Sequence, residues 1–264
     1  MKHSTRGGMY HVRRGRGRPL LLIHGLGGTW RSWVPVLDAL AREREVIALD
    51  LPGHGETPMI ADISVPRLAD AVTAFLEAND LREVDMVGSS MGARLVLELA
   101  RRGVGGRVVS LDPGGFWRGW ETVFFHRSIQ ASIKLVRALH AVMPLITHTD
   151  IGRTVLFPQF SPRPWNLPAD TVLAEMRSFA ASPAFDPLLE SLVKGARQQG
   201  APRGTTKEVV IGWGRQDRIC LPRQARRAVW LFQDASFKWF DDCGHFPHWD
   251  QPRETVRLVL DWTG

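Results

Sequence analysis

Short apolar runs alternate with helical patterns along most of the chain. Six runs have the length of strands, and their continuous apolar character is typical of strands that are buried on both faces. They cover residues 19–24, 45–50, 84–88, 107–112, 208–213 and 237–240. Four stretches have apolar residues at helical spacing: residues 36–41, 64–78, 92–102 and 254–262. This alternation predicts an α/β fold, with a mostly parallel central sheet flanked by helices.

One interval interrupts the alternation, because residues 116–199 contain no convincing strand. They contain helix-like stretches and one Pro-rich loop, at residues 121–142, 170–181, 187–198 and 157–168. We therefore predict a core made of residues 1–115 and 200–264, and a helical cap of residues 116–199 inserted between two strands. Ligands of open α/β sheets bind beyond the carboxyl ends of the strands, where such an insertion would cover them as a lid.

Composition narrows the class of protein. The chain has 264 residues, of which 44% are hydrophobic and 23% charged, which excludes disorder as its main state. No run approaches the ~18 apolar residues of a membrane span, and no apolar run follows the N-terminal charges as in a secretory signal. The two cysteines, Cys220 and Cys243, exclude a disulfide scaffold. We therefore expect a cytoplasmic protein without a membrane span.

The net charge of +7 raises the question of a nucleic-acid partner. Residues 1–18 carry six basic residues and no acidic one, so the rest of the chain is close to neutral. Such localised charge is typical of a solvated terminus, with an anionic partner as the alternative. We expect a small-molecule substrate and no nucleic acid, and we leave the oligomeric state open.

The strongest local motif is Gly-x-Ser-x-Gly at residues 88–92, with Ser90 at its centre. It lies between a predicted strand and a predicted helix, which is the context of a nucleophile elbow. The two glycines allow neighbouring backbones to approach closely, and the N-terminus of the helix favours a developing anion. The pattern predicts that Ser90 is a nucleophile, with a plain helix N-cap as the alternative. Ser89 lies off the centre of the motif.

A serine nucleophile needs a base, and the base needs a carboxylate that fixes its tautomer. His245 follows the last predicted strand, whereas His248 is interpreted as a neighbouring loop residue. Asp217 follows the strand at residues 208–213 and completes the chain order Ser…Asp…His. Asp112 also ends a predicted strand and is the alternative acid.

A glycine-rich loop follows the first predicted strand, with the sequence Ile-His-Gly-Leu-Gly-Gly at residues 23–28. We expect its Leu26 N–H and the N–H of Met91 to form an oxyanion hole. His24 is interpreted as a brace for this loop rather than as a second base. The loop matches neither dinucleotide nor Walker glycine patterns, so we expect no nucleotide, no other cofactor and no metal.

Taken together, these motifs resemble the α/β-hydrolase fold superfamily, in its group with a helical cap. Five segments occur in the order of that family, at residues 24–28, 50–55, 88–92, 214–217 and 244–247. The resemblance implies an α/β-hydrolase fold, a structural role for His54 and, because few residues precede the first predicted strand, loss of the first antiparallel strand. Dehalogenases and epoxide hydrolases of this superfamily use aspartate where Ser90 stands, which argues against both activities.

Ten tryptophans suggest an apolar substrate pocket. Of those in the insertion or near the motifs, we expect five to line the pocket: Trp30, Trp117, Trp165, Trp213 and Trp249. The alternative is that they pack inside the core.

We expect a serine hydrolase that cleaves a small or medium carboxylic ester, or a lactone, through an acyl-enzyme on Ser90. The first alternative is a hydrolase for a carbon–carbon bond next to a ketone, although that group usually has asparagine where Ser89 stands. The second alternative is a non-enzymatic ligand-binding protein on the same fold.

Overall fold

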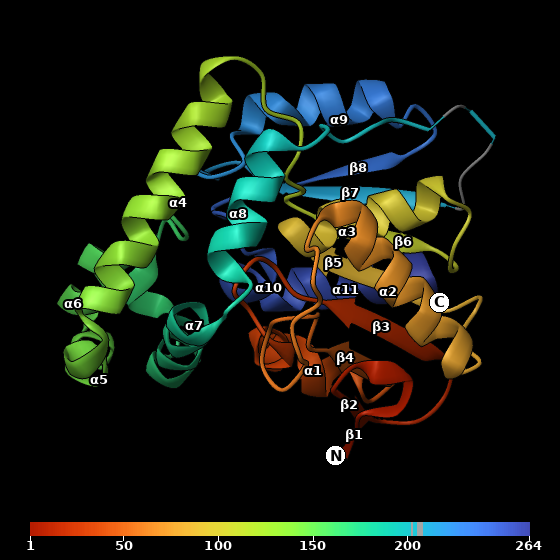
Figure 1. Cartoon of the computed structure of the whole chain (residues 1–264), viewed down its shortest axis with the longest axis horizontal. Helices are drawn as coiled ribbons and strands as arrows, with labels where there is room; N and C mark the ends of the chain where they lie inside the picture. Colours follow the sequence, from red (N-terminus) through yellow and green to blue (C-terminus); the bar gives the residue numbers. More distant parts are fainter. Residues whose placement is uncertain (202, 205–207) are drawn as a thin grey trace.

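An eight-stranded sheet runs through the part of the chain that the computed structural model describes, residues 1–201, 203–204 and 208–264 (Figure 1). The strands are β1 (Lys2–Ser4), β2 (His11–Arg14), β3 (Pro19–Ile23), β4 (Glu45–Leu49), β5 (Asp85–Ser89), β6 (Val108–Leu111), β7 (Val209–Gly214) and β8 (Ser236–Phe240). Their order across the sheet is β1-β2-β4-β3-β5-β6-β7-β8. The pairings among β3 to β8 are parallel, which confirms the predicted mostly parallel sheet.

Helices cover both faces of this sheet. Those outside the insertion are α1 (Val34–Leu40), α2 (Val65–Ala78), α3 (Met91–Arg101), α9 (Ala225–Leu231), α10 (Pro247–Asp250) and α11 (Pro252–Thr263). Side chains of β3 alternate between two buried clusters, as a two-sided strand requires. Leu20 and Leu22 pack with α1 and α11, whereas Leu21 and Ile23 pack with α2 and α3. Both faces of the sheet at β3 are therefore buried from solvent, which explains why the inner strands have continuous apolar sequences.

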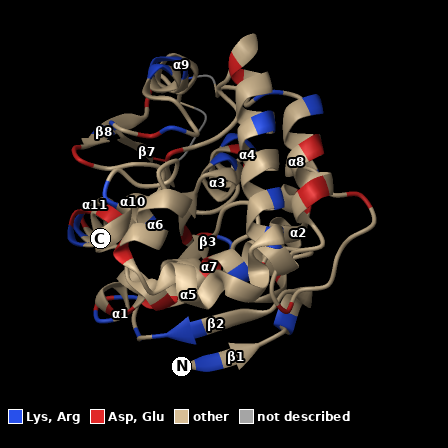
Figure 2. Cartoon of the chain, turned by 90° about the vertical axis from the view of Figure 1, so that its left-hand side faces the viewer, with Lys and Arg blue, Asp and Glu red and all other residues tan. Residues whose placement is uncertain are grey.

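The N-terminal segment corrects one expectation, because β1 is present and pairs antiparallel with β2. β1 is only three residues long and mostly exposed, so its sequence carries no apolar pattern. Four arginines of residues 1–18 form ion pairs elsewhere in the chain: Arg6 with Asp80, Arg13 with Glu45, Arg14 with Asp38 and Arg18 with Asp85. Figure 2 shows this positive charge on β1 and β2, at one edge of the sheet. The basic segment is therefore part of the fold, and several of its charges face carboxylates of the same chain.

Five helices lie between β6 and β7, within the described part of the chain. They are α4 (Trp120–Ala138), α5 (Met143–Thr147), α6 (Asp150–Leu156), α7 (Ala169–Ala181) and α8 (Phe185–Lys194). The first predicted helix ends earlier than expected, and Pro144, in the first turn of α5, begins a new helix. In Figure 1 these helices stand on the side toward which the arrow of β3 points. We call residues 116–199 the cap.

No single helix in the described residues is both long and apolar enough to cross a membrane. The segments Trp120–Ala138 and His140–Thr147 meet that test only as a pair, and the pair is bent by 67°.

Candidate active site

Ser90 occupies the turn between β5 and α3 in a backbone conformation that few residues adopt. Its φ and ψ angles are 57° and −113°, in a region that is costly for a residue with a side chain. The turn is also tightly packed, because a Cβ on Gly88 would lie 2.2 Å from the carbonyl oxygen of Gly92. A Cβ on Gly92 would lie 2.3 Å from the carbonyl oxygen of Ile23. Glycine at both positions allows the turn to present the Ser90 hydroxyl to the pocket.

Three of the residues singled out from the sequence come together here. The Ser90 Oγ lies 2.7 Å from Nε2 of His245, and His245 Nδ1 lies 2.8 Å from Oδ2 of Asp217. The other carboxylate oxygen of Asp217 accepts hydrogen bonds from the N–H groups of Ile219 and Cys220, at 2.7 and 3.0 Å. His245 and Asp217 are both buried. Because the carboxylate accepts the proton of Nδ1, Nε2 is left to accept the proton of Ser90.

Asp112, the alternative acid, has a different partner. Its Oδ1 accepts the N–H of Gly214 at 2.8 Å, whereas His245 is bonded to Asp217. Burial, followed by the negative charge of Asp217, raises the pKa of Asp112 well above its usual range. A neutral carboxyl group cannot balance the charge of an imidazolium, so the geometry favours Asp217 as the acid.

The two competing polar residues lie apart from this hydrogen-bond chain. His248 belongs to α10 and packs against Trp33, with ring centroids 4.5 Å apart. Its burial lowers the pKa to about 3, so the ring stays neutral. Ser89 is buried, its hydroxyl has no partner among the described residues, and it is not among the residues that line the pocket.

The loop after β3 brings the backbone of Leu26 to the same pocket as Ser90 and Met91. Among the described residues, no atom accepts a hydrogen bond from the N–H of Leu26 or of Met91. Unpaired N–H groups beside a nucleophile can bind an oxygen that gains negative charge. The geometry is therefore compatible with the predicted pair of oxyanion donors.

Two buried histidines support this loop. His54 Nε2 accepts the N–H of Gly27 at 3.1 Å, and His24 Nε2 accepts the N–H of Leu51 at 3.0 Å. Burial lowers the pKa of His54 to about 4 and lowers that of His24 well below its usual range. Both rings are thus neutral at pH 7 and can accept these bonds, which matches the bracing roles expected from the sequence.

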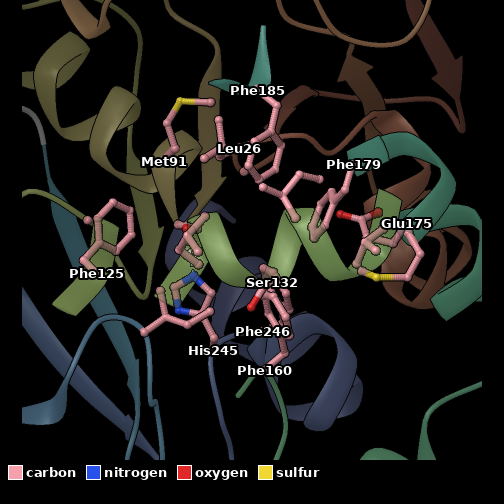
Figure 3. A pocket seen from close by; sticks show the side chains of 18 of the residues that line it. Leu26, Met91, Phe125, Ser132, Phe160, Glu175, Phe179, Phe185, His245 and Phe246 are labelled. Atoms are coloured by element: carbon pink, nitrogen blue, oxygen red, sulfur yellow. Dashed lines mark hydrogen bonds between the residues drawn. The ribbon is translucent and has the colours of Figure 1, made fainter. Parts of the chain in front are cut away.

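A pocket opens above Ser90, between the core and the cap (Figure 3). Most of its wall is apolar, with aliphatic side chains and six aromatic ones: Trp117, Phe125, Phe160, Phe179, Phe185 and Phe246. Among the described residues that line it, none is a lysine or an arginine. Such a pocket suits an uncharged, largely apolar substrate.

The tryptophans differ from the expectation, because of the five only Trp117 lines this pocket. Trp213 and Trp249 are buried, and their indole N–H groups donate to the backbone oxygens of Cys220 and Ser32. The other two also lie outside the lining: Trp30 is buried and Trp165 is 45% exposed. Three of the four therefore match the alternative of core packing.

No motif in the sequence marks the residues through which the cap contacts the site. Glu175 and Phe160 both line the pocket. Glu175 lies one helical turn from Val172 and from Phe179, on the apolar face of α7. A carboxyl group on an apolar helix face was the signal available in the sequence. Phe160 lies in a Pro-rich loop, where no periodicity marks it.

Within the described residues, one group of side chains has the spacing of metal ligands. Asp217, Cys220 and His245 bring one ligand atom each within 4.8 Å of one another. Two of them are already bonded to each other, and burial raises the pKa of the Cys220 thiol well above its usual value. A neutral thiol is a poor ligand, so we assign no metal to this group.

A model of the alpha/beta hydrolase family matches residues 20–258. The chain is 30% identical to the pimeloyl-[acyl-carrier protein] methyl ester esterase of Methylococcus capsulatus, over 97% of this chain and 98% of that protein. It is 28% identical to the 2-hydroxy-6-oxo-2,4-heptadienoate hydrolase of Pseudomonas putida, over 94% and 90%. It is 29% identical to the dihydrolipoyllysine-residue acetyltransferase component of the acetoin cleaving system of Cupriavidus necator, covering 96% of this chain but only 66% of that protein.

Solved structures share the fold at lower identity. A thermophilic esterase from Thermogutta terrifontis superposes with a TM-score of 0.73 at 18% identity, over 99% of this chain and 98% of the other. An enol-lactonase from Burkholderia xenovorans gives a TM-score of 0.74 at 16% identity, over 99% of both chains.

Proposed function

Because this chain belongs to the alpha/beta hydrolase family, we propose that it is a serine hydrolase that cleaves a small or medium carboxylic ester, or a lactone. The observation that carries the proposal is the continuous hydrogen-bond chain from Ser90 through His245 to Asp217, with distances of 2.7 and 2.8 Å. The Ser90 end of this series of hydrogen bonds faces an apolar pocket. There the N–H groups of Leu26 and Met91 have no hydrogen-bond partner among the described residues.

In the first half of the reaction, Ser90 Oγ attacks the carbonyl carbon while His245 Nε2 takes its proton. Asp217 stabilises the imidazolium through the hydrogen bond to Nδ1. The carbonyl oxygen becomes negative and accepts hydrogen bonds from Leu26 and Met91. The tetrahedral intermediate then collapses, and His245 gives the proton to the departing alcohol oxygen.

The acyl group then remains on Ser90 as an ester. Water enters the position of the alcohol and gives a proton to His245 Nε2 as it attacks the acyl carbon. Collapse of the second tetrahedral intermediate releases the carboxylic acid and returns the proton to Ser90. No group beyond Ser90, His245, Asp217 and the two N–H donors is needed for either half.

The pocket wall indicates what the acyl group looks like. It is apolar and aromatic, and none of its described residues is a cation that would pair with a negatively charged substrate. The cap contributes much of this wall and would keep water from the acyl-enzyme except at the attacking position. We therefore favour uncharged esters over substrates that carry a carboxylate.

Carbon–carbon bond cleavage is the second candidate, because relatives such as the Pseudomonas putida heptadienoate hydrolase match over nearly the whole chain. A substrate of that type carries a carboxylate. The absence of a cation among the described lining residues argues against a good fit.

Covalent labelling tests the proposal. A fluorophosphonate should modify the chain, and mass spectrometry of the digested protein should place the adduct on Ser90. Ser90→Ala should prevent labelling and remove nearly all turnover of aryl esters, whereas Ser89→Ala is the matched control and should label normally. Lack of labelling in the native chain would favour a non-enzymatic binding protein. Normal labelling with turnover of vinylogous diketones but not of esters would favour the second candidate.

A further inference from the structure

Glu175 is a buried carboxyl group in the substrate pocket to which the proposed reaction assigns no role. The described residues that line the pocket include two titratable side chains, His245 and Glu175. Glu175 belongs to the cap helix α7 and is surrounded by apolar neighbours such as Met176 and Phe179. Figure 3 shows Glu175 on the far side of the pocket from His245. It is therefore placed to contact the part of a substrate that is remote from the reacting carbonyl.

The hydrogen bonds of Glu175 leave one of its oxygens available. Both carboxyl oxygens lie 2.8 Å from the same atom, Ser32 Oγ, which also accepts the N–H of Thr29. A hydroxyl group has one hydrogen, so Ser32 can donate to only one of the two oxygens. The described residues provide no ion pair for Glu175. The second oxygen must carry a proton or find a partner in the pocket.

Burial determines which of these holds. Glu175 is 4% exposed, and burial raises its pKa to about 8, against a smaller lowering by the bond from Ser32. At neutral pH the group is mainly a carboxylic acid, which can donate one hydrogen bond and accept others. Apart from Ser90 and His245, the other polar side chain among the described lining residues is Ser132, whose hydroxyl already donates to Gln159 at 2.9 Å. Away from Ser90 and His245, Glu175 is thus the described lining side chain that can donate a proton to a ligand.

We propose that Glu175 is a specificity-determining residue that binds a hydroxyl group on the acyl chain of the substrate, so that the preferred substrates are esters of hydroxy-substituted acids. This inference rests on the proposed ester hydrolysis. A hydroxyl group can accept the proton of Glu175 and also donate to its other oxygen. An unsubstituted alkyl chain would leave Ser32 as the one polar neighbour of the buried carboxyl among the described residues, which is less favourable than a second hydrogen bond from the substrate. A carboxylate on the chain would meet repulsion whenever Glu175 is ionised.

The attachment of α7 to the core does not depend on Glu175 alone. On the same helix, Ser178 Oγ donates to the carbonyl oxygen of Gly27 at 2.7 Å. Just beyond the helix, Ser182 Oγ donates to the carbonyl oxygen of Gly53 at 2.9 Å. These two bonds hold the helix on the core, so a change at Glu175 can alter recognition while the cap stays attached.

The test compares matched aryl esters that differ only by a hydroxyl group at the end of the acyl chain, in a series of increasing chain length. In the native protein, kcat/KM for the hydroxyacyl ester should exceed that for the alkyl ester by roughly ten-fold at the best chain length, as expected for one hydrogen bond to a buried group. Glu175→Leu should abolish this ratio, mainly by improving turnover of the alkyl ester. Glu175→Gln keeps donor and acceptor atoms and should retain most of it.

Ser178→Ala is the control, because it removes a contact of α7 with the core and not a pocket group. It should leave the ratio unchanged. An equal ratio in the native protein and in Glu175→Leu, with normal fluorophosphonate labelling of both, would overturn the role of Glu175 and leave the proposed hydrolysis intact. Loss of labelling and of ester turnover in the native protein would instead overturn the proposed function.

Discussion

The backbone N–H of His245 donates a hydrogen bond to the carbonyl oxygen of Phe160, at 2.8 Å. Phe160 belongs to the cap, and its ring stacks on Phe246 with an angle of 3° between the ring planes. The loop that carries the proposed base is therefore held by the insertion. The cap therefore helps to position a proposed catalytic group in addition to lining the pocket.

Phe160→Leu should slow the reaction for every substrate. The smaller side chain loses the stacking on Phe246, so the loop with His245 becomes less well positioned. We expect kcat to fall roughly ten-fold for every ester, and fluorophosphonate labelling to slow in parallel. Because Phe160 also lines the pocket, the preference among ester chain lengths should shift in addition. A changed order with normal labelling would mean that Phe160 acts on the substrate and not on the base.

Trp117→Phe should change the preference among ester chain lengths and leave fluorophosphonate labelling intact. Trp117 is 2% exposed and lines the pocket, so the smaller ring enlarges the space for the acyl group. The preference among chain lengths should shift by ~10–200-fold in relative kcat/KM, the range for about one methylene, while labelling persists. Trp165→Ala, at a half-exposed position outside the pocket lining, is the control and should keep the native profile. An unchanged profile in Trp117→Phe would remove Trp117 from the specificity determinants.

Asp217→Asn and Asp112→Asn separate the two candidate acids. Asparagine at 217 would favour the wrong tautomer of His245, and kcat should fall by ~10⁴. Asparagine at 112 resembles the neutral carboxyl group that burial and Asp217 maintain there, so kcat should fall far less. Steady-state kinetics with one aryl ester measures both. Comparable losses, or the larger loss at Asp112, would transfer the role of acid to the end of β6.

Glu175→Gln should change the pH dependence of stability. The pKa of Glu175 is raised from 4.5 to about 8 in the folded chain, so between these values the folded state binds more protons than the unfolded state. Its contribution to stability is therefore lost as pH rises through this window. The Tm of Glu175→Gln relative to the native protein should increase from pH 4.5 to pH 8 and then level off. A constant difference in Tm across this window would contradict the buried, protonated carboxyl.

The fold and the proposed nucleophile could be predicted because their constraints are local in sequence. β3 to β7 are almost entirely buried on both faces, and the turn at Ser90 requires glycine at Gly88 and Gly92. Each of these requirements can be recognised from the types of a few neighbouring residues. β1 escaped prediction because three mostly exposed residues carry no such pattern, and only their pairing with β2 defines the strand.

The remaining parts of the site depend on contacts between distant segments. Asp112 and Asp217 both lie at or after the carboxyl ends of strands, and only the distance to His245 separates them. Glu175 and Phe160 reach the pocket because five cap helices pack in one particular way, which no local pattern specifies. The pocket wall was therefore the least predictable part, and the tryptophans were a poor guide to it.

Because of the position of β8, enzymatic activity can be used to follow the last stage of folding. β8 lies at the edge of the sheet opposite β1. Within the described part of the chain it pairs with β7 alone, and the loop that follows it carries His245. The Ser90 hydroxyl and the His245 ring are 155 residues apart in the chain. A molecule whose sheet is complete except for this strand would have much of its secondary structure but no positioned base. During refolding, the rate at which activity returns would therefore report the rate at which the edge strand pairs. The circular dichroism signal, which reports secondary structure, would recover earlier.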